Sequence, residues 1–346
     1  MYPDLKNHSA YFANQPIGGF TMKRVSRLLT GAVVLTLGLT ACGSDKKSGT
    51  TTAPVKLSGA VTLAVNPWDG SAANAEVAKA ILAKQGVKVT LKEIDENAVW
   101  AGLDDGAIGA NLEVWPSGHK KDIDTYVTSK KSVSDGGLLG PDGHIGWYIP
   151  KYVADAHPEF KTWEGLKTPE AAKFFKTAET GDKGQFLLGD PSYVSYDKDI
   201  IKNLNLPFKV VTGGGEAALI TAIGNAFKDK SPLLFYFYVP QWANNKYELV
   251  SVKLPDVTDA CTTSAADTGK DGKYNCDYPT DHLMKVISAK FETSNPGVAN
   301  FLKKMNWTST DQNAVTTYKN KDGMTMPAAA AKWVADNEAK WSAWLK

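Results

Sequence analysis

Three aromatic residues stand at or just beyond the ends of predicted β-strands. They are Trp68, Trp115 and Tyr238, and a proline lies within two residues of each. Ligands of α/β proteins bind beyond the carboxyl ends of the strands, so we expect these rings to face a ligand. Several ring faces that meet at one point suit a quaternary ammonium group, which donates no hydrogen bond and is held by cation–π attraction of about 0.5–2 kcal/mol per ring. The alternative is ordinary burial of the rings in a hydrophobic core.

The remaining motifs give no positive evidence for catalysis, a metal or a nucleotide. The histidines are scattered, without an HExxH motif or paired spacing, so no metal site is predicted. The run Gly213–Gly215 precedes a predicted helix but lacks the ending of a phosphate-binding P-loop, and we interpret it as a flexible start of that helix. The sequence contains no GxSxG nucleophile motif. We therefore predict a protein that is not an enzyme and needs no cofactor.

The charge balance disfavours a polyanionic partner. The chain has 39 Lys and Arg residues against 37 Asp and Glu, so we expect no nucleic-acid partner. The only arginines are Arg24 and Arg27, near the N-terminus. The rest of the chain therefore has no guanidinium group with which to bind phosphate, sulfonate or carboxylate through two parallel hydrogen bonds. Lysine also binds anions, so an anionic ligand is disfavoured rather than excluded.

Residues 22–42 have the pattern of a cleavable export signal. A basic start is followed by an apolar run, 28–40, that is shorter than the roughly 20 residues of a membrane-spanning helix. The last residues, Leu-Thr-Ala-Cys-Gly, resemble the bacterial lipobox, which implies that Cys42 carries lipid and begins the mature chain. We interpret residues 1–21 as an over-long start, with Met22 as the true initiator. An ordinary signal with an incidental cysteine is the alternative.

Residues 43–56 are mostly small and polar, and they cannot bury enough surface to fold. We predict that they form a flexible tether with an average reach of roughly 20 Å. The protein is then expected at the extracytoplasmic face of the cell membrane, anchored by the lipid on Cys42.

Cys261 and Cys276 are the cysteines that remain. An exported protein folds in an oxidising compartment, so we predict a disulfide between them that closes a polar surface loop. A metal site is the weaker alternative, because neither cysteine belongs to a CxxC motif and no histidine cluster lies near.

Predicted strands alternate with predicted helices from residue 57 to the end of the chain. The strands are expected at 61–66, 87–94, 108–114, 147–149, 186–188, 208–211, 233–239, 249–254 and 284–289. The helices are expected at 71–84, 97–104, 199–204, 216–228, 296–305, 310–319 and 327–345. This alternation favours βαβ units in an α/β fold with a mostly parallel sheet, and the length suffices for two lobes with separate cores. Trp333, Trp341 and Trp344 in the last helix are interpreted as core residues.

Several segments carry a family resemblance, and they occur in the family's order. They are Val-Asn-Pro-Trp-Asp at 65–69, Leu-Glu-Val-Trp-Pro-Ser-Gly-His at 112–119, Gly-Trp-Tyr-Ile-Pro at 146–150, Tyr-Phe-Tyr-Val-Pro-Gln-Trp at 236–242 and a tail from Asn295 to Leu345. This set resembles the solute-binding proteins of ABC importers for glycine betaine, choline and related osmolytes. The likeness runs from about residue 61 to residue 345.

The resemblance implies a two-lobed α/β clamp of the type II periplasmic-binding-protein class, with two crossings between the lobes. Lobe 1 would comprise 57–145 and 249–346, and lobe 2 would comprise 146–248. Closure of the lobes by a hinge motion would bury the ligand. The resemblance also implies a membrane permease and its ATPase subunit as partners, and a binding protein that acts as a monomer.

In that family an aromatic box holds the trimethylammonium group, and in some members backbone amides and a histidine hold the carboxylate of betaine. Carried over, the box would consist of Trp68, Trp115 and Tyr238, with Tyr193 as a further ring. The loop 190–193 would supply the amides, His119 would bind the carboxylate, and Asp69 would be a partner for the hydroxyl of choline.

Three departures from the family pattern keep several ligands open. Tyr238 stands where the family usually has Trp, His119 is one residue closer to Trp115 than usual, and the loop 190–193 lacks glycines that let a backbone approach a ligand. Choline is therefore a rival to glycine betaine as the main ligand. A binding protein of the same fold for an amino acid or a polyamine is also compatible with the sequence, and an extracellular choline-ester hydrolase is the least favoured interpretation.

Overall fold

The computed structural model describes residues 57–266 and 273–346. The expected start segment 1–21, the signal 22–42 with Cys42, and the tether 43–56 lie outside the described residues. Among the helices that are described, none is both long and apolar enough to cross a membrane.

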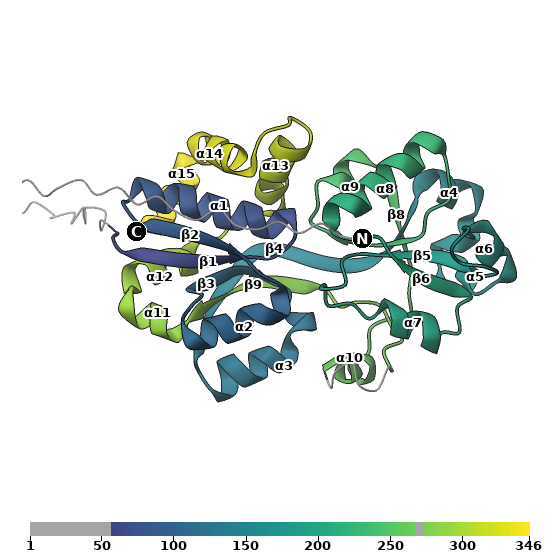
Figure 1. Ribbon diagram of the computed structural model, residues 1–346, viewed down its shortest axis with the longest axis horizontal. Helices are drawn as coiled ribbons and strands as arrows, with labels where there is room; N and C mark the ends of the chain where they lie inside the picture. Colours follow the sequence, from purple (N-terminus) through teal and green to yellow (C-terminus); the bar gives the residue numbers. More distant parts are fainter. Residues whose placement is uncertain (1–56, 267–272) are drawn as a thin grey trace, which may run out of the picture. The chain divides into compact units, whose positions relative to one another are not determined.

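The described residues form one mixed sheet of nine strands in the order β2-β1-β3-β9-β4-β7-β5-β6, with β8 paired to β4 beside this path (Figure 1). The strands are β1 Ala60–Val65, β2 Lys88–Glu93, β3 Ala110–Val114, β4 Val133–Pro150, β5 Gly184–Leu188, β6 Phe208–Thr212, β7 Phe235–Val239, β8 Leu249–Val252 and β9 Asp281–Ser288. β1 is parallel to β2 and β3, and β5 is parallel to β6 and β7. β4 and β9 run antiparallel to their neighbours, so the expectation of a mostly parallel sheet is wrong at its centre.

Strand β4 runs through the whole centre of the sheet (Figure 1). Residues 133–143 of β4 pair with β9, and residues 144–150 pair with β7 and β8. We call β1, β2, β3, β9 and residues 133–143 the β9 half of the sheet, and the rest the β7 half. The sequence predicted only the end of β4, because the stretch 134–146 is rich in glycine, which is typical of a loop. Two register shifts against β9 accommodate this stretch.

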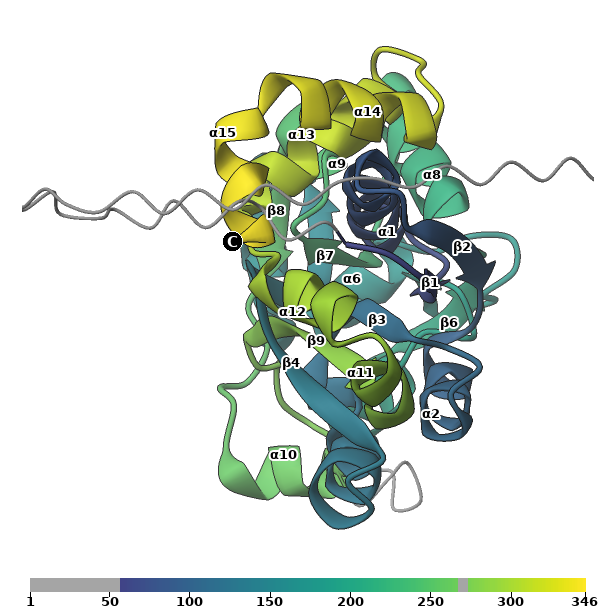
Figure 2. The same ribbon diagram turned by 90° about the vertical axis from the view of Figure 1, so that its left-hand side faces the viewer.

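Helices cover both faces of the sheet (Figures 1 and 2). They are α1 Asp69–Lys84, α2 Glu96–Asp105, α3 Lys120–Asp122, α4 Lys151–Ala156, α5 Trp163–Leu166, α6 Pro169–Phe174, α7 Asp197–Asn203, α8 Glu216–Asp229, α9 Ala243–Lys246, α10 Asp259–Ala266, α11 Ala289–Ser294, α12 Pro296–Lys304, α13 Ser309–Asn320, α14 Met326–Asp336 and α15 Glu338–Trp341. Three short 3-10 helices, η1 Pro116–Gly118, η3 Pro158–Lys161 and η4 Ser342–Leu345, and a π-helix, η2 Ile123–Ser129, complete the described elements. In the β9 half, α1, α13 and α14 pack together on one face, while α2 and α11 lie on the other (Figure 2).

The helix predicted at 327–345 is divided at Asn337. The Asn337 side chain donates a hydrogen bond to the carbonyl of Trp333, and such local side-chain bonds compete with helical backbone bonds. The tail nevertheless supplies core residues as predicted, since Trp333, Trp341 and Trp344 are all buried. The rings of Trp333 and Trp344 stack with a centroid distance of 6.1 Å.

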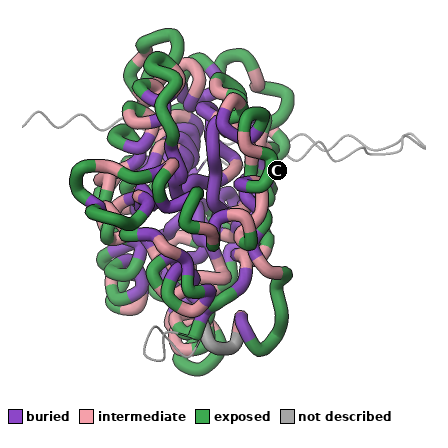
Figure 3. Tube along the Cα trace, turned by 90° about the vertical axis from the view of Figure 1, so that its right-hand side faces the viewer, coloured by how far each residue is buried: buried purple, intermediate pink, exposed green. Residues whose placement is uncertain are grey.

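Buried residues concentrate in the interior of the described chain (Figure 3). Apolar side chains from both halves of the sheet form the main core cluster. A smaller cluster lies under α2, where Val99, Trp100 and Leu103 pack against Val114 and Val286. The predicted disulfide between Cys261 and Cys276 is confirmed. The chain returns from β8 to β9 through residues 253–280, which contain this disulfide. The expected lobe boundaries at 145/146 and 248/249 stay predictions.

Burial on β1 predicts a large difference between two leucine truncations. Leu63 is fully buried, whereas Leu138 is 57% exposed. We expect Leu63→Ala to lower the free energy of unfolding by about 2–5 kcal/mol, because it leaves a cavity between β1 and the helices above it. The matched control Leu138→Ala should change it by less than about 0.5 kcal/mol. Urea denaturation of both variants measures the difference, and equal effects would contradict the assigned core.

Candidate functional site: an aromatic pocket

A pocket opens where elements of both halves of the sheet meet. Its wall consists of Trp68, Glu96, Trp115, Ser117, Gly118, Ile145, Tyr193, Val194, Tyr196, Tyr236, Tyr238 and Tyr278. Most of these side chains are aromatic, and Glu96 is the only charged residue among them. The geometry is therefore that of a small cavity with π faces and one carboxylate.

The two tryptophans reach the pocket because of the strand arrangement. Trp68 follows β1 and Trp115 follows β3, and these strands are parallel neighbours with Leu63 beside Ala110. Their carboxyl ends therefore lie at the same edge of the sheet. The indoles are only 9% and 7% exposed.

The buried carboxylate of Glu113 accepts hydrogen bonds from both indoles. Its Oε1 accepts hydrogen bonds from Nε1 of Trp68 at 2.7 Å and from Nε1 of Trp115 at 3.2 Å. Its Oε2 accepts from Nδ2 of Asn74 at 2.5 Å and from Nε2 of Gln312 at 3.3 Å. Because both indole N–H groups donate to the same carboxyl oxygen, this oxygen fixes the positions of the two rings relative to each other.

The environment of Glu113 brings its protonation equilibrium close to neutral pH. Burial raises the pKa of Glu113 to about 7, although the donors from Trp68, Trp115, Gln312 and Asn74 oppose the rise. The backbone also approaches closely here, since a Cβ atom on Gly70 would lie 2.8 Å from Oε2 of Glu113. Glycine at position 70 therefore leaves room for the carboxylate under the first turn of α1.

Tyrosines from the β7 half complete the ring set. Tyr193 meets Trp68 edge to face at a centroid distance of 5.7 Å, and Tyr238 meets Trp115 in the same way at 5.8 Å. Tyr236 lies between the two tyrosines, with its centroid 6.2 Å from each. The Tyr193 hydroxyl donates to the carbonyl of Pro67 at 2.8 Å, which ties this ring to the segment that carries Trp68.

Glu216, the first residue of α8, holds Tyr238 as Glu113 holds the indoles. It accepts hydrogen bonds from the Tyr238 hydroxyl, from Nε2 of Gln241 at 3.0 Å and from the backbone N–H of Asp69 at 3.2 Å. Burial, followed by the nearby charge of Asp69, raises the pKa of Glu216 to about 8. One carboxyl group therefore connects the start of α1 with the pocket tyrosine on β7.

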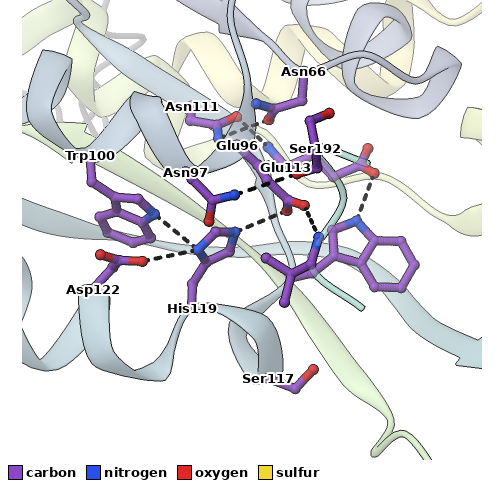
Figure 4. Close-up of polar contacts among 12 residues, drawn as sticks. Asn66, Glu96, Asn97, Trp100, Asn111, Glu113, Ser117, His119, Asp122 and Ser192 are labelled. Carbon is purple, nitrogen blue, oxygen red and sulfur yellow. Dashed lines mark hydrogen bonds and ion pairs between the residues drawn. The ribbon is translucent and has the colours of Figure 1, made fainter. Parts of the chain in front are cut away.

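Glu96 on the pocket wall is held by a backbone amide and a histidine (Figure 4). Its Oε1 accepts from the N–H of Val194 at 2.6 Å, and its Oε2 lies 2.9 Å from Nε2 of His119. Nδ1 of His119 lies 3.2 Å from the Asp122 carboxylate and also 3.2 Å from Nε1 of Trp100.

His119 is protonated in this arrangement. Burial lowers its pKa, but hydrogen bonds and charge attraction from Asp122 and Glu96 outweigh burial and raise the pKa to about 9. An imidazolium donates from both nitrogens, so it bonds to both carboxylates, and the Trp100 N–H has no acceptor at Nδ1. The Trp100 ring then acts as a packing partner of His119.

The structure brings together four of the residues proposed from the sequence and leaves two aside. Trp68, Trp115, Tyr193 and Tyr238 all line the pocket. His119 is 2% exposed and lies behind Glu96, outside the pocket wall.

The Asp69 side chain is turned toward α13. It accepts hydrogen bonds from Lys319 at 2.5 Å and from Asn320 at 2.6 Å, and it is not part of the aromatic pocket wall. Only its backbone N–H, which reaches Glu216, takes part in the framework around the pocket.

Sequence reasoning missed several residues of the site, namely Glu96, Glu113, Glu216, Tyr196, Tyr236 and Tyr278. Glu113 carries a usable signal, because it is a charged residue in a buried strand and shares a strand face with Trp115 two positions later. Metal ligation was not expected, and the described residues contain no group of three His, Cys, Asp or Glu side chains that would hold an ion.

Comparison with known proteins defines the fold class. The chain is similar to the lactococcal protein OpuAC in its closed form with glycine betaine, with a TM-score of 0.63, 20% identity, and coverage of 83% of this chain and 99% of the other. It is similar to an ABC-transporter choline-binding protein in complex with choline, with a TM-score of 0.63, 18% identity, and coverage of 83% and 91%. The predicted type II periplasmic-binding-protein fold is thereby confirmed.

The family follows from the sequence match. Residues 59–336 match the model of the substrate-binding domain of ABC-type glycine betaine transport systems, and the chain belongs to this family. A trimethylamine N-oxide-binding protein of Pelagibacter ubique (strain HTCC1062) is 25% identical over 339 residues, which cover 94% of this chain and 100% of that protein. The family consists of extracytoplasmic substrate-binding proteins of transporters rather than enzymes, and the chain is a substrate-binding protein for quaternary ammonium transport.

The raised pKa of His119 predicts a pH-dependent contribution to stability. The imidazolium is stabilised in the folded state, so its full contribution is present below the unfolded pKa of about 6.5 and is lost as pH rises through about 9. We expect the excess stability of the wild type over His119→Gln to be larger at pH 6 than at pH 10 by roughly 3 kcal/mol. Urea denaturation at both pH values measures it. Parallel profiles for the wild type and His119→Gln would contradict the account.

Proposed function

We propose that this protein captures a small trimethylammonium compound in the aromatic pocket and delivers it to an ABC-type permease with an ATPase subunit. It would do so as a monomer at the extracytoplasmic face of the membrane, held there by lipid on Cys42. The observation that carries the proposal is a ring-lined pocket whose only charged wall residue is a carboxylate, Glu96.

The polar atoms of four pocket rings are turned to partners within the protein. The indole N–H groups of Trp68 and Trp115 end on Glu113, and the hydroxyl groups of Tyr193 and Tyr238 end on Pro67 and Glu216. At these four rings a ligand therefore meets π surface rather than a free donor. A trimethylammonium group needs no hydrogen bond, and each desolvated ring attracts it by about 0.5–2 kcal/mol.

Glu96 bears on the choice among trimethylammonium ligands. The donors that the resemblance assigns to a ligand carboxylate are amides of the loop 190–193 and His119. Nε2 of His119 lies 2.9 Å from Oε2 of Glu96, and the amides of Ser192 and Tyr193 donate to Asp190. A ligand with its own carboxylate would also meet the negative charge of Glu96, which disfavours it. The hydroxyl of choline, by contrast, can donate a hydrogen bond to Glu96. The pocket therefore favours choline over glycine betaine.

Trimethylamine N-oxide is a second candidate, because the relative from Pelagibacter ubique is named for binding it. Its oxygen is an acceptor, so it would need a proton between itself and the Glu96 carboxylate. Binding of trimethylamine N-oxide would then take up a proton, whereas binding of choline would not. Calorimetry in two buffers of different ionisation enthalpy distinguishes the two.

A polyamine ligand and an ester-hydrolase activity fit the pocket less well. A polyamine would require several open carboxylates, but Glu113 and Glu216 already accept hydrogen bonds from pocket side chains and are not part of the wall. An ester hydrolase would require a nucleophile next to a base. The serine on the pocket wall, Ser117, donates instead to Asp281 at 2.7 Å.

Removing either indole should abolish most of the affinity. We expect Trp68→Ala and Trp115→Ala each to weaken choline binding by at least about 30-fold, because each loses a ring worth about 2 kcal/mol to a desolvated cation. Isothermal titration calorimetry measures the change. Trp163→Ala, which alters a tryptophan outside the pocket wall, is the matched control and should bind normally. Unchanged affinity in both pocket variants would remove the proposal.

Neutralising Glu96 should shift ligand preference. We expect Glu96→Gln to weaken choline binding and to improve glycine betaine binding, so that the ratio of their dissociation constants moves toward betaine by at least about tenfold. The exposed residue Glu164 on α5 provides the control Glu164→Gln, which should leave the ratio as it is. A ratio that does not move in Glu96→Gln would show that this carboxylate does not select the ligand.

A further inference from the structure

One wall of the pocket includes a residue that lies just beyond the disulfide. Tyr278 is 2% exposed and lines the pocket two residues after Cys276. Its hydroxyl oxygen accepts a hydrogen bond from the backbone N–H of Tyr196 at 2.7 Å, and Tyr196 lines the pocket as well. None of the segments that carry the family resemblance contains either residue.

Tyr196, Tyr274 and Tyr278 form a compact ring cluster, which we call the tyrosine wall. Tyr196 stacks on Tyr274 with centroids 4.3 Å apart and planes at 14°, and on Tyr278 with centroids 5.7 Å apart and planes at 29°. Tyr274 is 2% exposed, and its carbonyl accepts from Nδ2 of Asn203 at the end of α7 at 3.0 Å. The disulfide segment thus packs against the β7 half through Tyr274 and Tyr278.

The disulfide lies at the centre of this arrangement. Cys276 stands between Tyr274 and Tyr278, and it is bonded to Cys261 on α10. Both cysteines are buried, at 2% and 4% exposure. Helix α10 also contacts η1, which follows Trp115. The disulfide therefore connects a helix next to the Trp115 side of the pocket with the segment that carries Tyr274 and Tyr278.

Hydrogen bonds supplement the cross-link within this segment. The described residues between β8 and β9 pair with no strand of the sheet, apart from a bridge of Lys253 to Thr162. The N–H of Asp277 donates to the carbonyl of Pro255 at 2.8 Å, and the Tyr274 hydroxyl donates to the carbonyl of Asp277. Both are bonds within the segment itself. The position of the tyrosine wall therefore depends on the cross-link, on ring packing and on the hydrogen bonds that Tyr274 accepts from Asn203 and Tyr278 accepts from Tyr196.

We propose that the disulfide Cys261–Cys276 is a positioning element of the binding site, which holds Tyr274 and Tyr278 against Tyr196 and so orders the tyrosine wall before the ligand arrives. Without the cross-link, the ligand must order this wall as it binds, and that ordering cost lowers affinity. Only the identity of the ligand in this inference rests on the proposed function.

The test compares the wild type with the double variant Cys261→Ala/Cys276→Ala, using choline as the probe. We expect calorimetry to give a dissociation constant about 5- to 20-fold higher for the double variant. Hydrogen exchange without ligand should show the Tyr196 amide exchanging at least about tenfold faster, because its acceptor on Tyr278 is released. Amides shared by β1 and β2 should exchange at the wild-type rate. Thr262→Ala, next to Cys261 with the cross-link intact, is the matched control and should match the wild type in both measurements.

A second variant keeps the inference testable if the double variant does not fold. Tyr274→Leu retains the disulfide and removes the stack on Tyr196, and it should change affinity and Tyr196 exchange in the same direction. Wild-type affinity or wild-type exchange at Tyr196 in the folded variants would overturn the inference, because both must change together. If the wild type binds no trimethylammonium compound, the proposed function fails, and the exchange of Tyr196 alone then decides whether the disulfide holds the wall.

Discussion

The binding site depends on one buried carboxylate. Glu113 accepts both indole N–H groups on a single oxygen, and this fixes the two rings that end β1 and β3 relative to each other. The cost of burying the carboxylate is offset by its four N–H donors, two of which come from Asn74 on α1 and Gln312 on α13. The packing of these helices on the β9 half thus contributes to the geometry of the pocket, because it supplies two of the donors that keep Glu113 in place.

Three carboxylates around the pocket accept hydrogen bonds from different partners and so have different structural roles. Glu113 orients the indoles, and Glu216 orients Tyr238 while it accepts the backbone N–H that starts α1. Glu96 faces the cavity and accepts the backbone N–H of Val194. Three of these hydrogen bonds join residues of the β9 half to residues that follow strands of the β7 half. They run from Asp69 N–H to Glu216, from Val194 N–H to Glu96, and from the Tyr193 hydroxyl to the carbonyl of Pro67. The contacts that shape the pocket therefore also join the two halves of the sheet, as the proposed ligand-driven closure would require.

The sequence predicted the aromatic residues of the pocket that follow strands, but not the residues that hold them in place or complete the wall. Trp68 and Trp115 were predictable because parallel strands place their carboxyl ends at one edge, and Tyr238 was predictable in the same way from β7. Glu96 and Tyr278 were not predictable, because they reach the pocket through partners 98 and 82 residues away, at Val194 and Tyr196. The two halves of the sheet were recognisable as βαβ units, whereas the antiparallel centre was hidden by the glycines of β4. Likewise, the sequence did not show that Glu96 contacts His119, a donor that the resemblance assigned to a ligand carboxylate.

The central claim is that the pocket recognises a positive charge by its rings and not merely an apolar group of the right size. The most direct test is calorimetric titration of the wild-type protein with choline and with 3,3-dimethyl-1-butanol, its uncharged isostere in which carbon replaces nitrogen. The account predicts that choline binds at least about 30-fold more tightly, because the isostere fills the same space without cation–π attraction. Equal affinity for the two compounds would show that the rings form an ordinary hydrophobic pocket and would contradict the account.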